Sequence, residues 1–261
     1  MSRVVQLQGQ FLARFCETAR ARLARSLALL AAGASTNAGA IRIELYSLAG
    51  EAAFLGCTDV LALARQGEAA ARRIPEEPAA VVGCMRAVRA LGRALDALEA
   101  GRSRGEHPAV PAAPAPLQEP PPQQAPEAAV RGRILLVDDS KLSSDLLTSM
   151  LVEEGFAVET ASTGAGLERA LATFRLDLAI SDVNMPDLDC AVVCRRVREA
   201  APRARVVLIS GLAEEALARE CERVRADGYV ARERGLTAVV ERVLAEHAGL
   251  AEHAGAPEQT R

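Results

Sequence analysis

A proline-rich segment near the middle of the chain limits what its 261 residues can fold into. Eight of the thirteen prolines fall between Pro108 and Pro126, among alanines and glutamines. Proline lacks a backbone N–H and fixes φ, so such a run cannot form a helix or the interior of a sheet, and it extends as a semi-rigid spacer. We therefore predict two folded domains, residues 1–104 and 131–250, a linker at 105–130 and a disordered tail at 251–261.

The first domain has the pattern of helices throughout. Between Phe11 and Leu98, apolar residues recur every three or four positions, which is the period of an amphipathic helix. We expect Gly33 to end the first helix, residues 35–37 (Ser-Thr-Asn) to cap the second, and Pro78 to open the fourth. Four helices with short connections predict an all-α, antiparallel four-helix bundle.

The second domain alternates between strands and helices. Residues 134–137 form a short, continuous apolar run, which is typical of a strand buried on both faces. The expected strands are 134–137, 156–161, 178–181, 206–210 and 228–230, and the expected helices are 141–154, 163–174, 188–200, 213–225 and 235–247. This alternation predicts an α/β domain with a doubly wound, five-stranded parallel sheet.

Acidic residues follow two of these strands. Asp138 and Asp139 come after the first strand, Asp182 ends the third, and Ser210 ends the fourth. Ligands of such sheets gather beyond the carboxyl ends of the strands, so these side chains are expected to converge. Three carboxylates close together repel one another, and Mg²⁺, which prefers oxygen ligands, relieves that repulsion. Asp182 could then attack a phosphoryl group in line.

Four segments of this domain resemble the receiver domain of response regulators, in order and at matching spacing. They are Val137-Asp138-Asp139-Ser140, Ser181-Asp182-Val183-Asn184-Met185-Pro186-Asp187, Ile209-Ser210-Gly211 and Ala226-Asp227-Gly228-Tyr229-Val230. The resemblance implies a flavodoxin-like, CheY-like receiver in a two-component phosphorelay. Its phosphodonor would be a sensor histidine kinase or a histidine phosphotransfer protein.

The same resemblance implies a role for each matching residue. Asp182 is the expected phosphoacceptor. Asp138 and Asp139 are expected to hold Mg²⁺ with Asp182 and the backbone carbonyl of Asn184. Ser210 and Tyr229 match the switch pair, in which the hydroxyl moves to the phosphoryl group and the aromatic ring follows inward.

One position departs from the receiver pattern. The family places a lysine after the fifth strand, whereas this chain has Arg232 followed by Glu233. Arginine keeps the positive charge but is longer and planar. We expect phosphorylation with an altered rate or weaker switching, and a receiver that no longer accepts phosphate is the alternative. Lys141, the one lysine of the chain, does not fill the vacant position and is interpreted as an exposed first-turn residue.

The first domain resembles a histidine phosphotransfer (HPt) domain without its histidine. That family carries His-x-Leu-Lys-Gly on an exposed helix, and this chain has Tyr46-Ser47-Leu48-Ala49-Gly50. The tyrosine hydroxyl has a pKa near 10, which makes it a poor substitute for an imidazole nucleophile. The resemblance therefore implies a degenerate domain that docks a partner around Tyr46 and Gly50 but relays no phosphate. The alternative is a dimerisation bundle with Tyr46 half-exposed on its surface.

Composition narrows the remaining function classes. The net charge of −3 and the absence of a helix-turn-helix region argue against DNA binding. No glycine-rich nucleotide loop is present, so we expect no enzyme activity beyond self-catalysed aspartyl phosphorylation. A haloacid-dehalogenase-like phosphohydrolase is a weaker alternative, because that class has Asp-x-Asp where this chain has Asp138-Asp139.

No apolar run is long enough to span a membrane and no signal peptide is recognisable, so we expect a cytoplasmic protein that signals to an unknown protein partner. The six cysteines (Cys16, Cys57, Cys84, Cys190, Cys194 and Cys221) are expected to stay reduced.

Overall fold

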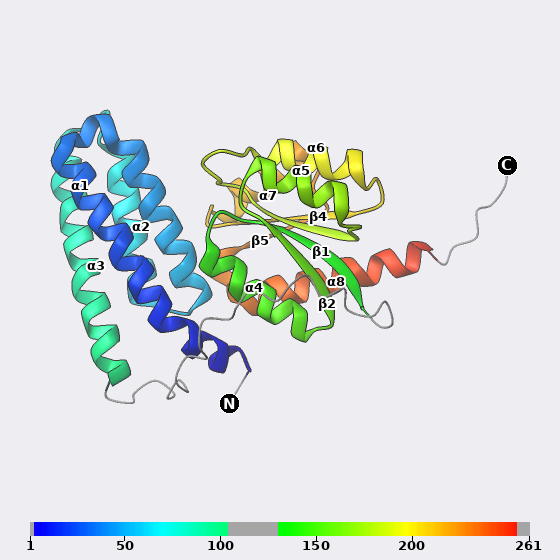
Figure 1. Ribbon diagram of the computed structural model, residues 1–261. Coiled ribbons are helices and arrows are strands. Elements are labelled where there is room, and N and C mark those ends of the chain that lie inside the picture. Colours follow the sequence, from blue (N-terminus) through cyan, green and yellow to red (C-terminus); the bar gives the residue numbers. More distant parts are fainter. Residues whose placement is uncertain (1–2, 104–129, 255–261) are drawn as a thin grey trace. The chain divides into compact units, whose positions relative to one another are not determined.

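The computed structural model describes residues 3–103 and 130–254 (Figure 1). It divides into two compact units at residues 121 and 122, which fall inside the predicted linker. The linker itself lies almost wholly outside the described residues, as do residues 255–261 of the predicted tail. Within the described residues, no helix is both long enough and apolar enough to cross a membrane.

The described residues of the first unit form helices α1 (Arg3–Phe54), α2 (Thr58–Arg73) and α3 (Ala80–Ser103). Non-helical backbone at Gly33 (φ 134°, ψ 93°) divides α1 into two halves. Arg22 in the first half forms ion pairs with Glu44 (3.1 Å) and Glu51 (3.0 Å) in the second, so the halves run antiparallel (Figure 1). The unit is thus a bundle of four helical segments, as predicted.

The junction at Gly33 differs from the prediction in one respect. Residues 35–37 were expected to cap the start of the second helix. Instead, the Asn37 side-chain amide donates to the backbone carbonyls of Gly33 (3.0 Å) and Leu29 (3.2 Å). Asn37 therefore satisfies carbonyls at the end of the first half. Likewise, α3 begins at Ala80, two residues after Pro78, because residues 78 and 79 form a turn.

The backbone at Gly33 leads to a matched pair of stability predictions. Gly33→Ala is expected to destabilise the chain by about 1–3 kcal/mol, because L-residues rarely adopt this positive φ. Gly39→Ala, on an exposed helical turn with nothing within 4 Å of the added Cβ, is expected to stabilise it by about 0.5–1 kcal/mol. Chemical denaturation monitored by circular dichroism measures both changes. Equal effects at the two glycines would contradict the assignment of Gly33 as the hairpin residue.

The second unit is an α/β domain with one parallel sheet in the order β2-β1-β3-β4-β5. The strands are β1 (Gly132–Val137), β2 (Phe156–Ala161), β3 (Leu178–Asp182), β4 (Arg205–Ser210) and β5 (Gly228–Ala231). The helices are α4 (Lys141–Glu153), α5 (Gly164–Thr173), α6 (Cys190–Ala200), α7 (Glu214–Val224) and α8 (Gly235–Ala254), with a short 3₁₀ turn at Arg232–Arg234. The predicted doubly wound sheet is confirmed. The predicted tail begins too early, because α8 continues through residues 251–254.

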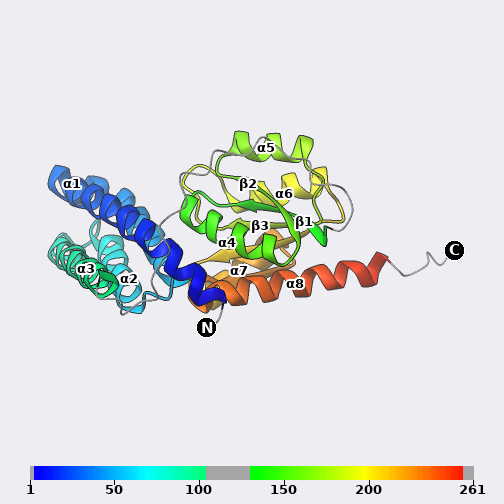
Figure 2. The ribbon, with the colours of Figure 1, turned by 60° about the horizontal axis from the view of Figure 1, so that its bottom comes forward.

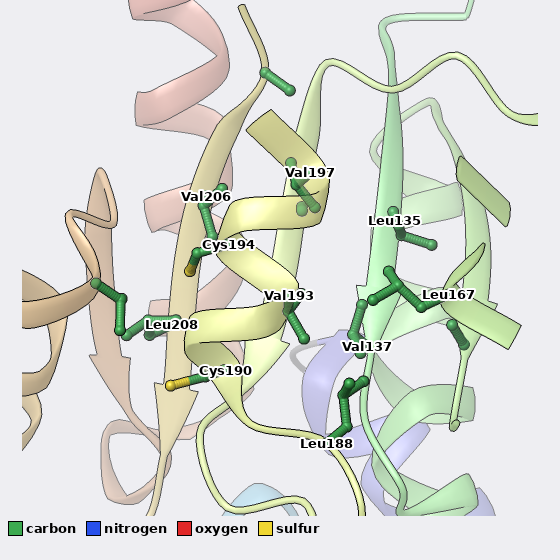
Figure 3. Packing of buried hydrophobic residues seen from close by; sticks show 14 of the residues in the cluster. Leu135, Val137, Leu167, Leu188, Cys190, Val193, Cys194, Val197, Val206 and Leu208 are labelled. Carbon is green, nitrogen blue, oxygen red and sulfur yellow. The ribbon is translucent and has the colours of Figure 1, made fainter. Parts of the chain in front are cut away.

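Helices cover both faces of this sheet (Figure 2). Helices α5, α6 and α7 pack on one face, while α4 and α8 contact each other on the other. On the first face, α6 lies over β3, and its buried residues belong to one cluster with residues of β1 and β4 (Figure 3). Each fully buried leucine or valine there contributes roughly 1.5–3 kcal/mol. This double cover fixes the strand ends, where the acidic residues lie.

Candidate functional site

Three carboxylates meet at the carboxyl edge of the sheet. Asp138 and Asp139 follow β1, and Asp182 ends the neighbouring strand β3, so adjacent strands deliver them to one place. One oxygen from each lies within 4.8 Å of the others. Asp138 is 2% exposed and Asp182 is 3% exposed. The predicted convergence of these three residues is therefore present in the structure.

Backbone N–H groups orient the two buried carboxylates. The N–H of Ser140 donates to Asp138 Oδ1 (2.8 Å), and the N–H of Asn184 donates to Asp182 Oδ1 (3.3 Å). Ser140 is also the N-cap of α4, since its Oγ accepts from the N–H of Ser143 (3.3 Å). The turn that starts α4 thus fixes the direction of Asp138.

Arg232 reaches from the end of β5 into this cluster and is 2% exposed. Its Nη2 lies 2.7 Å from Asp138 Oδ2 and 2.8 Å from Asp182 Oδ2. Its Nη1 donates to Ser143 Oγ at 3.1 Å. The sequence pointed to Arg232 as the cation of the site but missed Ser143. The signal available for Ser143 was a hydroxyl in the first helical turn after the acid pair.

Burial controls the ionisation of Asp138. Removal from water is the largest cause and raises the pKa of Asp138 to about 7, while Arg232 lowers this pKa and Asp182 raises it. A raised folded-state pKa means that the protonated carboxyl is favoured. Ionised Asp138 therefore reduces stability increasingly as the pH rises from about 4 to about 7.

The charge of the cluster fits a divalent cation. Three carboxylates with one guanidinium leave two formal negative charges among oxygen donors that lie close together. Mg²⁺ is small, takes oxygen ligands and typically uses few carboxylates. Asp138, Asp139 and Asp182 are thus suitable ligands. The backbone carbonyl of Asn184 remains a prediction.

Proton and metal binding are expected to compete at Asp138. Because burial raises the pKa of this carboxyl to about 7, more of it is protonated at pH 6 than at pH 8. We expect Mg²⁺ to bind severalfold more weakly at pH 6 than at pH 8. Isothermal titration calorimetry at constant ionic strength measures the ratio. Equal affinities at the two pH values would contradict a role for Asp138 as ligand.

Ser210 and Tyr229 lie on neighbouring strands, β4 and β5. Ser210 is fully buried, and its Oγ accepts from the Asn184 side-chain amide (3.3 Å) and from the N–H of Leu212 (3.2 Å). Tyr229 is partly buried and packs against the core under α5–α7. Their movement as a switch pair remains a prediction. Lys141 is 81% exposed and lies 3.7 Å from Asp145, in agreement with its interpretation as a surface residue.

The structure corrects the expectation for Tyr46 and Gly50. Both were predicted on an accessible helix face, with Tyr46 exposed or half-exposed, but both are buried and Tyr46 is only 5% exposed. The Arg65 guanidinium of α2 lies 5.7 Å from the centre of the Tyr46 ring. Ala49, at the position of the family's lysine, is fully buried as well. These residues therefore do not form an open docking surface in this structure.

Comparison with known proteins gives an independent view of the α/β unit. Residues 134–244 match the model of the response regulator receiver domain. The chain is 32% identical over 114 residues to the chemotaxis protein CheY of Treponema pallidum. This match covers 42% of the present chain and 79% of that protein. It is 28% identical over 110 residues to the TorCAD operon transcriptional regulatory protein TorR of Escherichia coli K12, covering 42% of this chain and 47% of TorR.

A solved structure is also similar. It is a CheY-like receiver domain protein from Methanospirillum hungatei JF-1, with a TM-score of 0.43 and 21% identity, covering 47% of this chain and 98% of that one. The family match contains every site residue from Asp138 to Arg232 but excludes the helical unit. The HPt resemblance of residues 1–104 therefore stays a prediction.

Proposed function

Because the chain belongs to the response regulator receiver family of two-component signalling, we propose that its α/β unit accepts a phosphoryl group on Asp182 and signals through protein contacts. The observation that carries this proposal is the convergence of three carboxylates and the Arg232 guanidinium at one strand edge. A histidine kinase or an HPt protein would be the phosphodonor.

The residues of the chain suit a phosphoryl transfer. An Asp182 carboxylate oxygen would attack phosphorus, forming an acyl phosphate as the bond from phosphorus to the donor nitrogen breaks and that nitrogen keeps the electron pair. Arg232, 2.8 Å from Asp182, would neutralise charge on the phosphoryl oxygens, and the Ser210 hydroxyl would donate to one of them. Mg²⁺ held by Asp138, Asp139 and Asp182 would supply further charge neutralisation when bound.

The experiment that tests this function treats the full chain with acetyl phosphate and Mg²⁺. We expect intact mass spectrometry to show one added phosphoryl group, placed on Asp182 by peptide mapping. Removing Mg²⁺ with a chelator should suppress the addition. Beryllofluoride mimics the phosphoryl group. It should shift the backbone amide NMR signals of the residues around Ser210 only when Mg²⁺ is present. An unmodified Asp182 under all conditions would overturn the proposal.

The ion pairs of Arg232 favour one alternative. Its Nη2 lies 2.7 Å from Asp138 and 2.8 Å from Asp182 and neutralises part of the charge on these carboxylates. A receiver fixed in this way could serve as a phosphorylation-independent scaffold. Under that alternative, partner binding measured by pull-down is the same for the wild type and for Asp182→Ala. A difference between the two supports phosphate-dependent signalling.

We propose that the helical bundle is a docking or dimerisation module. No histidine precedes His107 in the sequence, so the bundle has no imidazole to carry phosphate. Light scattering of the full chain distinguishes a homodimer from a monomer. A monomer favours docking of another protein.

Tyr46→His is not expected to restore phosphorelay. A histidine at this buried position would face the Arg65 guanidinium, and Ala49 supplies no lysine. The measurement mixes phosphorylated wild-type chain with Tyr46→His/Asp182→Ala chain and scores acid-labile phosphohistidine on the variant. The Asp182→Ala chain with Tyr46 intact gives the background. Signal above that background would show that the bundle still supports transfer.

A further inference from the structure

Ser143 contacts the site but has no role in the chemistry proposed above. Its side chain is fully buried in the first turn of α4, and its Oγ accepts the hydrogen bond from Arg232 Nη1 at 3.1 Å. Its own N–H donates to Ser140 Oγ, which is the cap of the helix. The hydroxyl position is therefore set by the start of α4 rather than by a mobile loop.

The planar guanidinium links this hydroxyl to the carboxylates. Nη2 lies between Asp138 and Asp182, at 2.7 Å and 2.8 Å, while Nη1 bonds to Ser143. The two nitrogens belong to one rigid, planar guanidinium group. A hydrogen bond at Nη1 therefore also restricts the position of Nη2. Asp138 follows β1 and Ser143 lies in the first turn of α4, the next element of the chain, whereas Asp182 ends β3. The bond to Ser143 thus favours the position of Arg232 beside Asp138.

We infer that Ser143 is a positioning residue that holds Arg232 against Asp138, so that Arg232 and Mg²⁺ compete for this carboxylate. The inference rests on the proposed function, because it concerns the resting form of the same site. A divalent cation held by Asp138 would displace the guanidinium from this carboxylate and so would break its hydrogen bond to Ser143. Ser143 thereby weakens metal binding and stabilises the unphosphorylated receiver.

A double-mutant cycle on the full chain tests this coupling. Isothermal titration calorimetry with Mg²⁺ alone, at pH 8 and constant ionic strength, measures affinity without any phosphodonor. We expect Ser143→Ala to bind Mg²⁺ about threefold to tenfold more tightly than the wild type, because one charge-assisted hydrogen bond of the competing cation is lost. Lysine is shorter and ends in one nitrogen, so it lacks the two separate nitrogens with which Arg232 contacts Ser143 and the carboxylates. In the Arg232→Lys background, Ser143→Ala should therefore change the affinity by less than about twofold.

Ser144→Ala is the matched control. Ser144 is the next residue of the same turn and is 7% exposed, while the hydrogen bond from Arg232 Nη1 goes to the hydroxyl of Ser143. It should bind Mg²⁺ like the wild type. Ser143→Cys has nearly the size of serine but a weak acceptor, and it replaces Ser143→Ala if the alanine variant does not fold.

The outcomes are separable from those of the proposed function. The inference is overturned if Ser143→Ala binds Mg²⁺ no more tightly than the wild type, if the gain persists in the Arg232→Lys background, or if no variant binds Mg²⁺. If acetyl phosphate does not modify the chain but the Mg²⁺ affinities of the variants change as expected, only the proposal of phosphorylation is overturned. If acetyl phosphate modifies Asp182 but Ser143→Ala does not change the Mg²⁺ affinity, only the role of Ser143 is overturned.

Discussion

Asp182→Asn is expected to abolish phosphorylation of the chain by acetyl phosphate. The amide keeps the shape of the carboxyl group and can still accept the N–H of Asn184, but it is not a nucleophile. We expect the rate of phosphoryl incorporation to fall by about a thousandfold or more, the scale on which removal of a nucleophile acts. Intact mass spectrometry over a time course measures it. The substitution should also lower the pKa of Asp138, because the Asp182 charge helps to raise that pKa.

Asp187→Asn is the matched control for this prediction. Asp187 lies five residues after Asp182, in the loop that follows β3, and its side chain is exposed. The same change of charge at this position should leave the rate within about twofold of the wild type. Phosphorylation of Asp182→Asn at the wild-type rate would show that another residue is the acceptor.

Arg232→Ala is expected to destabilise the chain by about 3–5 kcal/mol at pH 8. The change removes the counter-ion of two buried carboxylates, Asp138 and Asp182, which lie 2.7 Å and 2.8 Å from its Nη2. Burial already raises the pKa of Asp138, and loss of the guanidinium raises it further. The destabilisation is therefore largest at high pH, where Asp138 is ionised, and shrinks as the pH falls and Asp138 takes up a proton. Urea denaturation at pH 8 and pH 5 measures both values.

If the carboxylates hold Mg²⁺ as proposed, adding Mg²⁺ should restore part of this stability, because the proposed site forms only in the folded state. Arg196→Ala serves as the comparison. Arg196 is 43% exposed and pairs with Glu168 at 2.7 Å, so its loss should change the stability little at either pH, because an exposed ion pair is screened by solvent. If Arg232→Ala lowers the free energy of unfolding by the same amount at pH 5 and pH 8, unpaired carboxylates are not the cause of the loss.

The α/β unit could be predicted almost completely from the sequence, for a physical reason. Strands such as Ile134–Val137 are buried on both faces, so they form continuous apolar runs that end abruptly at polar residues. Parallel strands bring those ends to one edge, which is why Asp138, Asp139 and Asp182 were found together. The contact of Arg232 with Ser143 was not predictable, because it depends on the reach and rotamer of one long side chain across 89 residues.

The helical bundle was less predictable at the level of single residues. The spacing of apolar residues predicted its four helical segments. It does not predict how much of each helix face is buried by the neighbouring helices. Tyr46 was expected on an open face because it stands where the HPt family has its histidine, and the structure buries it beside Arg65. The break at Gly33 was predicted at the right position, but the side chain of Asn37 serves the preceding segment instead of the following one.

The hairpin at Gly33 has a consequence for the order in which the chain acquires its structure. Arg22 meets Glu44 across only 22 residues, so the first two helical segments pair through contacts that are local in sequence. Strand β1 pairs with β2 and β3 in parallel. Helix α4 lies between β1 and β2 in the chain, and α4, β2 and α5 lie between β1 and β3. Local contacts form faster than parallel pairings that close long loops. During synthesis from the N-terminus, the bundle can therefore be complete before the last strand of the sheet exists.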